Sequence, residues 1–284
     1  MTGAGGQLGH DLVAAFAGVG AWECVAADHA ALDVADRDQV LGAIISLRPD
    51  AVVHAAAWTA VDACETDPDR AWQVNALGSR HVADACARVG AHLCAISTDY
   101  VFDGRSAVPY TEWDETHPLS MYGRSKLGGE REIVTLVPGA CVVRTSWLCG
   151  ASGPNFVKTM LRLAASSSSS AGPVRVVDDQ HGCPTFTADL AAMVRHLVTT
   201  RLPGTFHVTN GGPTTWFSLA QSVFSLAGAD AARVEPISTA ELDPPRAAPR
   251  PANSVLDNAA LRLSGIPALA DHHEPLERLV KELS

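Results

Sequence analysis

The chain has 284 residues, 47% of them hydrophobic and 18% charged, which is typical of a globular protein large enough for one α/β domain and a smaller lobe. Its formal net charge of −10 argues against binding to nucleic acid or to an anionic membrane, because phosphate contacts need clustered lysine and arginine. Seven cysteines without a C-x-x-C pair, no apolar run of about 18 residues and no recognisable secretory leader indicate reduced thiols in a cytoplasmic protein, with no membrane partner.

In chain order, short apolar runs alternate with helical patterns through the first half of the chain. We predict strands at residues 23–27, 51–57, 92–97 and 141–145. We predict helices at residues 8–17, 37–47, 68–89 and 122–134. This alternation is typical of successive βαβ units and indicates an α/β fold of the Rossmann type, a doubly wound parallel sheet with helices on both faces.

After about residue 148 the spacing becomes less regular and proline more frequent. We predict further helices at residues 155–165, 189–199, 218–227 and 276–283. The proline-rich stretch 244–251 is expected to be a loop, and the serine run Ser166–Ser170 a solvated loop to which we assign no function.

Glycines near the start of the chain indicate a nucleotide site. Gly3, Gly6 and Gly9 form a G-x-x-G-x-x-G run that leads into the first predicted helix. Because these positions lack a Cβ, backbone N–H groups at the helix N-terminus can approach a pyrophosphate. Such a turn is weak evidence alone, but Asp28 follows the next predicted strand, where an acid would meet the adenosine ribose. Asp33-Val34 would then lie beside the adenine.

A Rossmann unit needs a buried strand before its first glycine, and only two residues precede Gly3. We therefore expect about five apolar residues to be missing upstream, about the length of a short strand. Residues 1–148 are expected to form the NAD(P)-binding domain, with about 184–210 returning to it. Residues of about 149–183 and 211–284 are expected to form a smaller C-terminal lobe that binds the substrate.

Tyr122 and Lys126 lie four residues apart in a predicted helix, in a chain with only three tyrosines and three lysines. Residues i and i+4 share one face of a helix. An ammonium beside a phenol stabilises the phenolate, so we expect Lys126 to lower the pKa of Tyr122 below its usual value of about 10 and to make the pair a proton donor. On spacing alone, a helix-surface tyrosine and lysine without chemistry is the alternative.

With the Gly-rich turn, the run Ser97-Thr98-Asp99-Tyr100 and Tyr122-x-x-x-Lys126 in this order, the chain resembles the extended short-chain dehydrogenase/reductases. More narrowly it resembles the dTDP-4-dehydrorhamnose reductase family. The motifs that carry this resemblance span nearly the whole chain: Trp58-Thr59-Ala-Val-Asp62-x-x-Glu65, Arg144-Thr-Ser-Trp147, Asn155-Phe156-x-Lys158, Asp179-Gln180-x-Gly182-x-Pro184-Thr185, Thr215-Trp216 and Arg250-Pro-x-Asn253-Ser254.

The resemblance implies NAD(P)H-dependent reduction of the C4 ketone of dTDP-4-dehydro-L-rhamnose to give dTDP-L-rhamnose. Tyr122 would act as general acid, Lys126 would hold the nicotinamide ribose, and Thr98 would hydrogen-bond the developing oxyanion. The implied cofactor contacts are Gly3, Gly6, Gln7, Leu8, Gly9, Asp28, Asp33, Val34, Ala57, Trp58, Thr59, Tyr122 and Lys126. The implied substrate contacts are Thr98, Asp99, Trp147, Asn155, Arg250 and Asn253.

Several of these residues also have a structural interpretation. Thr98 is interpretable as a turn residue, Trp147 as a core residue, and Asp99 and Arg250 as solvated loop charges. His54 is expected to be a hydrogen-bonded residue under the cofactor rather than a catalyst. The run Asp271-His272-His273 is expected to be a surface loop rather than a metal site.

Two departures from the family bear on cofactors. No arginine or lysine follows Asp28 before Arg37, and a carboxylate would repel a 2′-phosphate, so NADH is favoured over NADPH, with Arg37 as the first alternative cation. Some relatives bind Mg²⁺ between subunits. Asp11 could serve as one ligand, but Ala188 stands where a second carboxylate is wanted. Mg²⁺ is therefore doubtful, we predict no metal ligands, and we expect a monomer or weak homodimer.

Two other functions stay open on the sequence. One is a catalytically silent, NAD(P)-binding regulatory subunit of a methionine adenosyltransferase. The other is a nucleotide-sugar epimerase or dehydratase of the same fold. The complete set Thr98, Tyr122 and Lys126 favours the reductase, and Asp99-Tyr100 after Thr98, in place of Asp-Glu, weighs against a dehydratase.

Overall fold

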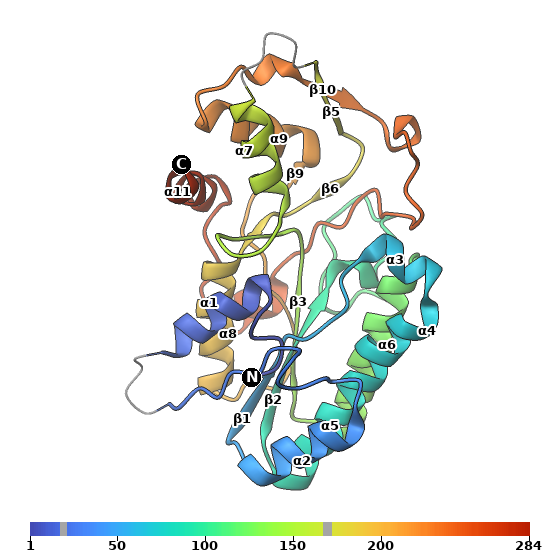
Figure 1. Cartoon of the computed structure of the whole chain (residues 1–284), viewed down its shortest axis with the longest axis vertical. Coiled ribbons are helices and arrows are strands. Elements are labelled where there is room, and N and C mark those ends of the chain that lie inside the picture. Colours follow the sequence, from blue (N-terminus) through green and yellow to red (C-terminus); the bar gives the residue numbers. More distant parts are fainter. Residues whose placement is uncertain (18–21, 167–171) are drawn as a thin grey trace.

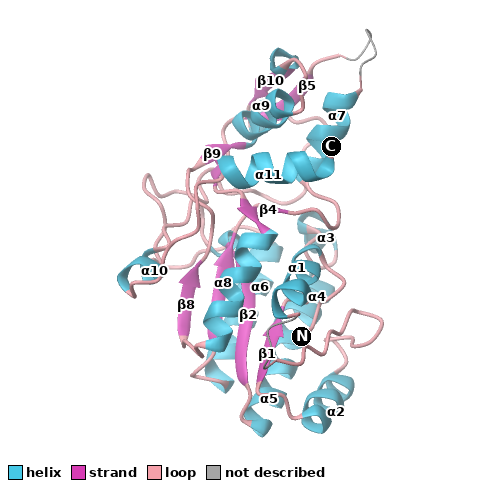
Figure 2. Cartoon of the chain, turned by 90° about the vertical axis from the view of Figure 1, so that its left-hand side faces the viewer, coloured by secondary structure: helices cyan, strands magenta, loops and turns pink. Residues whose placement is uncertain are grey.

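The computed structural model describes residues 1–17, 22–166 and 172–284, so most of the predicted serine loop lies outside the described residues. A parallel sheet forms the centre of the molecule, with the strand order β1-β2-β3-β8. Its strands are β1 (Ala51–His54), β2 (His92–Thr98), β3 (Cys141–Thr145) and β8 (Gly204–His207). The first three confirm predicted strands. Figure 2 shows β1, β2 and β8 running in the same direction.

The strand predicted at residues 23–27 is wrong as a continuous strand. Only Ala27 forms a bridge, to Thr2, and Thr2 also bridges His54, both in parallel orientation. The Met1 amino group donates to the Val25 carbonyl at 2.8 Å, and the Ala27 N–H donates to the Met1 carbonyl at 2.9 Å. Thr2 thus lies between this segment and β1, where a first strand would run. A strand needs a neighbouring strand to pair with. For residues 23–27 the neighbour consists of Met1 and Thr2, which is too short for more than a single bridge.

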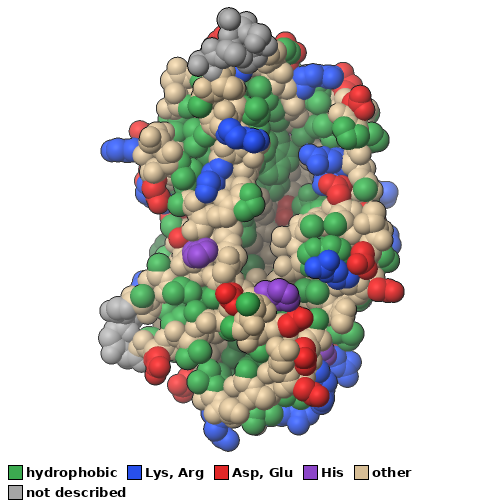
Figure 3. Space-filling view, in the orientation of Figure 1, with side chains coloured by type: hydrophobic (Ala, Val, Ile, Leu, Met, Phe, Trp, Pro, Cys, Tyr) green, Lys and Arg blue, Asp and Glu red, His purple; other side chains and the backbone are tan. Residues whose placement is uncertain are grey.

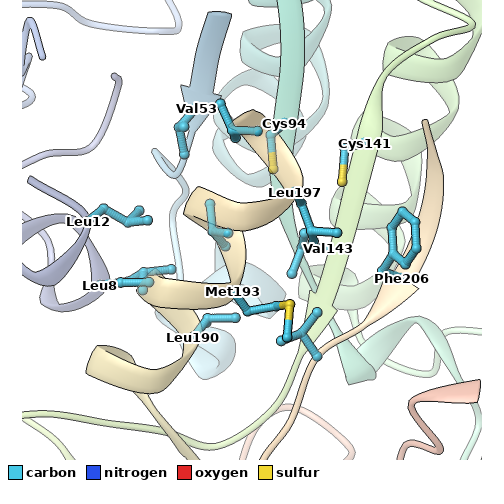
Figure 4. Close-up of a cluster of buried hydrophobic side chains, with 14 of the residues drawn as sticks. Leu8, Leu12, Val53, Cys94, Cys141, Val143, Leu190, Met193, Leu197 and Phe206 are labelled. Carbon is cyan, nitrogen blue, oxygen red and sulfur yellow. The ribbon is translucent and has the colours of Figure 1, made fainter. Parts of the chain in front are cut away.

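Helices cover both faces of the sheet (Figure 1). One face carries α1 (Gln7–Phe16) and α8 (Thr187–Thr199). The other carries α2 (Arg37–Leu47), α5 (Gly78–Val89) and α6 (Met121–Leu136). Each layer buries an apolar helix stripe against the strands, and a fully buried leucine or valine contributes roughly 1.5–3 kcal/mol. On the α1–α8 face the buried side chains include Leu8, Leu12, Val53, Cys94, Cys141, Val143, Leu190, Leu197 and Phe206 (Figure 4).

The predicted helix at 68–89 is confirmed, with one irregularity. It consists of α4 (Pro68–Ala71), a π-helical turn η1 (Trp72–Leu77) and α5. Asp67 starts it by accepting a hydrogen bond from the Arg70 N–H at 3.1 Å. π-Helical turns inside helices are frequent at functional sites.

A second core lies in the part of the molecule drawn at the top of Figure 1. Here α7 (Phe156–Ala165), α9 (Trp216–Leu226) and α11 (His273–Leu283) pack together beside a parallel pair, β5 (Val174–Val177) and β10 (Val234–Ile237). Its buried side chains include Val157, Met160, Leu219, Val223, Phe224 and Leu276. The four helices predicted after residue 148 are confirmed as α7, α8, α9 and α11. Residues 244–251 form neither helix nor strand, as predicted.

Short elements complete the chain: α3 (Val61–Thr66), η2 (Asp99–Val101), β4 (Leu148–Cys149), β6 (His181–Gly182), β7 (Thr185–Phe186), β9 (Thr214–Thr215), η3 (Ala231–Arg233), η4 (Thr239–Glu241) and α10 (Ala259–Leu263). Two of these elements, β4 and β7, pair in parallel, and β6 and β9 pair in antiparallel orientation. None of the helices among the described residues combines the length and the apolar character that crossing a membrane requires.

Candidate active site

The carboxyl ends of β1 and β2 meet the Gly-rich turn, and two cavities adjoin there. One has a volume of about 620 Å³ and the other about 390 Å³. Both are lined by Gly3, Gly6, Ala55 and Ala57, so they form one continuous depression across the turn. Figure 3 shows this face of the molecule hollowed in its upper half, between the side that carries α7 and the side that carries α3. Parallel α/β sheets bind ligands at this edge.

The Gly-rich turn is built so that only glycine fits at two of its positions. Gly3 has a φ of +72°, and a Cβ there would lie 2.5 Å from the Ala56 backbone nitrogen. A Cβ on Gly9 would lie 2.2 Å from the Gly3 carbonyl oxygen. No side chain caps the start of α1. The first N–H groups of this helix therefore have no side-chain partner, and phosphate binding there stays a prediction.

The larger cavity contains the residues predicted to surround the adenosine. These are Asp28, Asp33 and Val34, and Trp58, another of the implied cofactor contacts, lines the cavity with them. It also contains a cation that sequence reasoning missed: Arg70 lines the cavity, with its guanidinium 4.6 Å above the Trp58 ring. Arg37, the cation that the sequence suggested, is not in the lining and pairs with Asp38 and Asp84 instead.

The smaller cavity brings together the predicted catalytic residues. Thr98, Tyr122 and Lys126 line it, with the predicted cofactor contacts Gln7, Leu8, Gly9 and Thr59. Ser120 caps α6 by accepting a hydrogen bond from the Gly123 N–H at 3.2 Å, which places Tyr122 in the first turn and Lys126 one turn later. The Lys126 ammonium donates to the carbonyl of Ile96, near the end of β2, at 2.7 Å. Every predicted cofactor contact thus lines one of the two cavities.

The pKa of Tyr122 corrects a prediction. Burial raises the pKa of its phenol well above the usual value, and a hydrogen bond to Thr98 opposes this only in part. Our expectation that Lys126 lowers it is wrong for this structure, because loss of water outweighs the other influences and the ammonium binds the Ile96 carbonyl. Burial lowers the pKa of Lys126 to about 8, against the opposing charge of Glu130.

Three of the predicted substrate contacts line the smaller cavity: Thr98, Asp99 and Trp147. The Thr98 hydroxyl donates to Asp99 Oδ1 at 3.0 Å, and burial raises the pKa of Asp99 to about 6. Trp147 stacks on Trp216 with ring centroids 3.6 Å apart, and both rings line the cavity. Trp147 also has a φ of +46°, a strained conformation for a bulky residue, of a kind often found at binding sites.

The other three predicted substrate contacts line neither cavity, and their side chains have protein partners. Asn155 caps α7, accepting from the Lys158 N–H at 3.0 Å. Arg250 makes two hydrogen bonds to Asp62, of 2.6 and 2.7 Å, which help to lower the pKa of Asp62 to about 2. The Asn253 amide donates to the Ser106 carbonyl at 2.8 Å. Their roles toward a sugar stay predictions.

Asn75 is a residue that sequence reasoning missed. It lies in the π-helical turn, accepts the Trp58 N–H at 2.8 Å and donates to the Trp58 carbonyl at 3.1 Å. It also donates to the Ser125 hydroxyl at 3.0 Å. Asn75 therefore ties the segment that lines both cavities to α6, and no pattern in the sequence points to it.

His54 is a hydrogen-bonded structural residue, as predicted. Its two ring nitrogens contact the hydroxyls of Thr2 at 2.8 Å and Ser79 at 3.2 Å, and burial lowers its pKa to about 3. Asp271, His272 and His273 bring potential ligand atoms within 4.8 Å of one another. They lie in the lining of neither cavity.

A nucleotide cradle at a helix N-terminus, joined to a cavity with Thr98, Tyr122 and Lys126, defines an NAD(P)H-dependent oxidoreductase of the short-chain dehydrogenase/reductase type. The family model described as RmlD substrate binding domain matches residues 1–284. A dTDP-4-dehydrorhamnose reductase from Streptomyces griseus is 46% identical over 275 residues, covering 95% of this chain and 88% of the relative. The chain belongs to this dTDP-4-dehydrorhamnose reductase family.

Solved structures agree. The reductase from Clostridium acetobutylicum superposes with a TM-score of 0.94 at 40% identity, covering 99% of this chain and 98% of the other. The Bacillus anthracis enzyme, determined in complex with NADP, gives a TM-score of 0.93 at 40% identity, covering 99% and 97%. A UDP-glucose 4-epimerase from Thermus thermophilus, at 22% identity and a TM-score of 0.83, shows a shared fold alone.

Proposed function

We propose that this protein reduces the C4 ketone of dTDP-4-dehydro-L-rhamnose to give dTDP-L-rhamnose, using NADH or NADPH. The observation that carries the proposal is the convergence of Thr98, Tyr122 and Lys126 in a cavity continuous with the nucleotide cradle. The cradle fits a dinucleotide, because Gly3 and Gly9 have no room for a Cβ and no side chain caps α1. When bound, the nicotinamide supplies the hydride.

The side chains of the protein supply the proton that completes the reduction. Because burial keeps the pKa of Tyr122 high, its phenol carries its proton throughout the physiological pH range. It can donate that proton to the C4 oxygen, which becomes an alkoxide as the hydride adds to C4. Proton donation of this kind typically contributes ~10²–10⁴-fold in rate. The Thr98 hydroxyl, held at the end of β2, would hydrogen-bond the same oxygen. Lys126 would hold the nicotinamide ribose.

The sugar would lie between Trp147 and the catalytic set. Trp147 and Trp216 offer a stacked aromatic wall, and Asp99 lies on the same lining as Thr98. Aromatic faces and buried polar groups suit the mixed apolar and polar surface of a deoxysugar. The resemblance also implies sugar contacts by Asn155, Arg250 and Asn253, which line neither cavity in this structure.

The direct test is oxidation of the reduced cofactor on mixing the protein with the keto-sugar. We expect loss of nicotinamide absorbance with dTDP-4-dehydro-L-rhamnose. The same assay should include dTDP-4-keto-6-deoxy-D-glucose, because a relative from Streptomyces niveus named as a reductase of that sugar is 40% identical over 267 residues, 94% of this chain and 90% of the relative. A preference for the second sugar would overturn the assigned substrate. NADH binding without turnover of either sugar would instead favour the regulatory-subunit hypothesis.

We also propose that the reaction takes place in the cytoplasm and that the protein is a monomer or weak homodimer. All seven cysteines are unpaired thiols, which supports a reducing compartment. Light scattering across a concentration series would test the oligomeric state, and a stable dimer at the lowest concentration would contradict it.

A further inference from the structure

A third residue shares the helix face of the catalytic pair. Tyr122, Lys126 and Glu130 follow one another at intervals of four on α6, so each lies one turn below the last. Glu130 is 7% exposed and lies in the lining of neither cavity. It therefore cannot touch the cofactor or the sugar, and any role in the reaction must pass through its neighbours.

Those neighbours are the two central strands. The Ser97 hydroxyl donates to Glu130 Oε1, and Arg144 donates from Nε to Oε1 at 3.0 Å and from Nη2 to Oε2 at 2.8 Å. Ser97 on β2 and Arg144 on β3 are direct partners in the sheet. Glu130 thus fastens α6 to both strands at their carboxyl ends.

The fastened segment carries the catalytic groups. Ser97 stands between Ile96, whose carbonyl accepts the Lys126 ammonium at 2.7 Å, and Thr98, which lines the catalytic cavity. A shift of this strand end would move the acceptor of Lys126 and the hydroxyl of Thr98 together. Displacements of about 1 Å in such an arrangement can cost on the order of 10²-fold in rate.

Glu130 also supplies charge. Two ionisable groups can act on Lys126 through their charge: Glu130 on α6 and His54 at the end of β1. The ionisable groups that face Tyr122 and Glu130 on the same helix are Cys64 on α3, Asp99 and Tyr100 after β2, and Arg144 on β3. His54 is neutral because its pKa is about 3. Burial lowers the pKa of Lys126 to about 8, and the charge of Glu130 is the influence that opposes this.

We propose that Glu130 is a positioning residue of the active site: it fixes the end of β2 that carries Thr98 and the acceptor of Lys126, and its negative charge keeps Lys126 an ammonium. The inference rests on the proposed function for turnover, but NADH binding tests it without any sugar.

The test is Glu130→Gln, which keeps the shape and removes the charge. NADH affinity is measured by nicotinamide fluorescence from pH 6 to 9.5. Lys126 holds its proton below its pKa, so the parent should lose affinity as the pH rises through about 8. In the variant this loss should begin about one pH unit lower, as expected for removing a nearby opposite charge. At pH 6 the variant should bind NADH within about twofold of the parent, and the alkaline limb of kcat/KM should move by the same interval.

Two variants separate this role from a merely structural one. The control is Glu132→Gln, which removes a partly exposed carboxylate from the same helix. Glu132 pairs with Arg80 at 3.5 Å, and its replacement should leave the pH profile unchanged. Glu130→Gln with Arg144→Met removes both buried charges, so that no unpaired charge remains if the single variant fails to fold. A folded double variant whose alkaline limb stays displaced supports the proposal. An alkaline limb at the parent's position in both variants would overturn it.

Discussion

Tyr122 retains its proton because its phenol is buried, and the neighbouring Lys126 does not offset this effect. Its phenol is buried against Tyr100, with ring centroids 5.6 Å apart, and burial is the largest influence on its pKa. Lys126 is directed to the Ile96 carbonyl instead. The phenol is thus protonated at neutral pH, while Lys126, with a pKa of about 8, is the member of the pair that titrates in the mildly alkaline range.

Replacing Tyr122 with phenylalanine removes the proton and keeps the ring. We expect kcat to fall by about 10²–10⁴-fold with little change in NADH affinity, because the interaction is made mainly in the transition state. Lys126→Ala should weaken NADH binding and turnover together. Stopped-flow reduction of the keto-sugar and fluorescence titration of NADH measure the two quantities. Turnover of Tyr122→Phe within about threefold of the parent would place the acid elsewhere.

Asp28 lines the larger cavity, and the resemblance implies that its carboxylate lies where a 2′-phosphate would bind, so we predict that NADH is used at least as efficiently as NADPH. The measurement is kcat/KM for both cofactors. A tenfold preference for NADPH, about 1.4 kcal/mol, would contradict this. Arg70, which lines the same cavity, would then be the cation responsible, and Arg70→Ala should abolish the preference while Arg37→Ala should not.

The raised pKa of Asp99 predicts how the stability of the protein depends on pH. Its pKa is about 6 in the folded protein and 3.8 in its ordinary state, so the folded form favours the protonated acid. The free energy of unfolding is therefore highest below about pH 4, where Asp99 is protonated in both the folded and the unfolded chain. It decreases as the pH rises from there through 6, because only the unfolded chain gives up this proton readily. Asp99→Asn removes this penalty, and we expect a higher Tm than the parent at pH 8, by an amount equivalent to at most about 3 kcal/mol, and a similar Tm at about pH 3.5, below the ordinary pKa. Equal effects at both pH values would contradict the assignment.

At the scale of the element, the start of α1 and the π-helical turn decide how closely a cofactor can approach. The Gly-rich turn brings the backbone of residues 3–9 against β1, and Asn75 holds Trp58 by both of its backbone groups. Arg70 and Val74 of this helix line the larger cavity together with Gly3 and Gly6. The irregular helix is therefore part of the binding site, although its side chains are far from the glycines in sequence.

Gly9→Ala tests the turn. Its Cβ would lie 2.2 Å from the Gly3 carbonyl, so the turn must move, and we expect NADH affinity to fall at least tenfold. The matched control is Gly42→Ala in α2, where nothing lies within 4 Å of the new Cβ. That change should leave affinity unaltered and stabilise the helix by about 0.5–1 kcal/mol. Equal affinities for both variants would show that the turn does not carry the phosphate.

At the scale of the whole molecule, the catalytic cavity is shared between the two cores. Thr98, Tyr122 and Lys126 come from the large sheet and its helices, and Trp216 opens α9 in the second core. Trp147 follows β3 and stacks on Trp216, so it joins the two parts at the site. The division into residues 1–148 with 184–210, and 149–183 with 211–284, stays a prediction, which limited proteolysis would test.

We predict that turnover survives chelation. A hard cation such as Mg²⁺ wants several oxygen ligands, and Asp11 is the one we could place from the sequence. The Asp271, His272 and His273 group lines neither cavity. The rate should be unchanged after dialysis against EDTA. Loss of most activity, restored by Mg²⁺, would show that carboxylates outside these residues bind a metal.

The sequence by itself determined what depends on local spacing. Alternating apolar runs predicted three strands of the sheet, glycine spacing predicted the cradle, and the interval of four placed Tyr122 and Lys126 on one helix face. These features follow from the fixed periods of strand and helix, which any reader of the chain can count.

Only the tertiary structure decided what depends on burial and on distant partners. It reversed the expected pKa of Tyr122, because the loss of water around a side chain is set by everything packed over it. It brought Arg70 into the lining of the same cavity as Asp28, paired Arg250 with Asp62, and joined Glu130 to Ser97 and Arg144. It reduced the strand expected at 23–27 to a single bridge and added β8, because a strand is defined by its neighbour and not by its own residues.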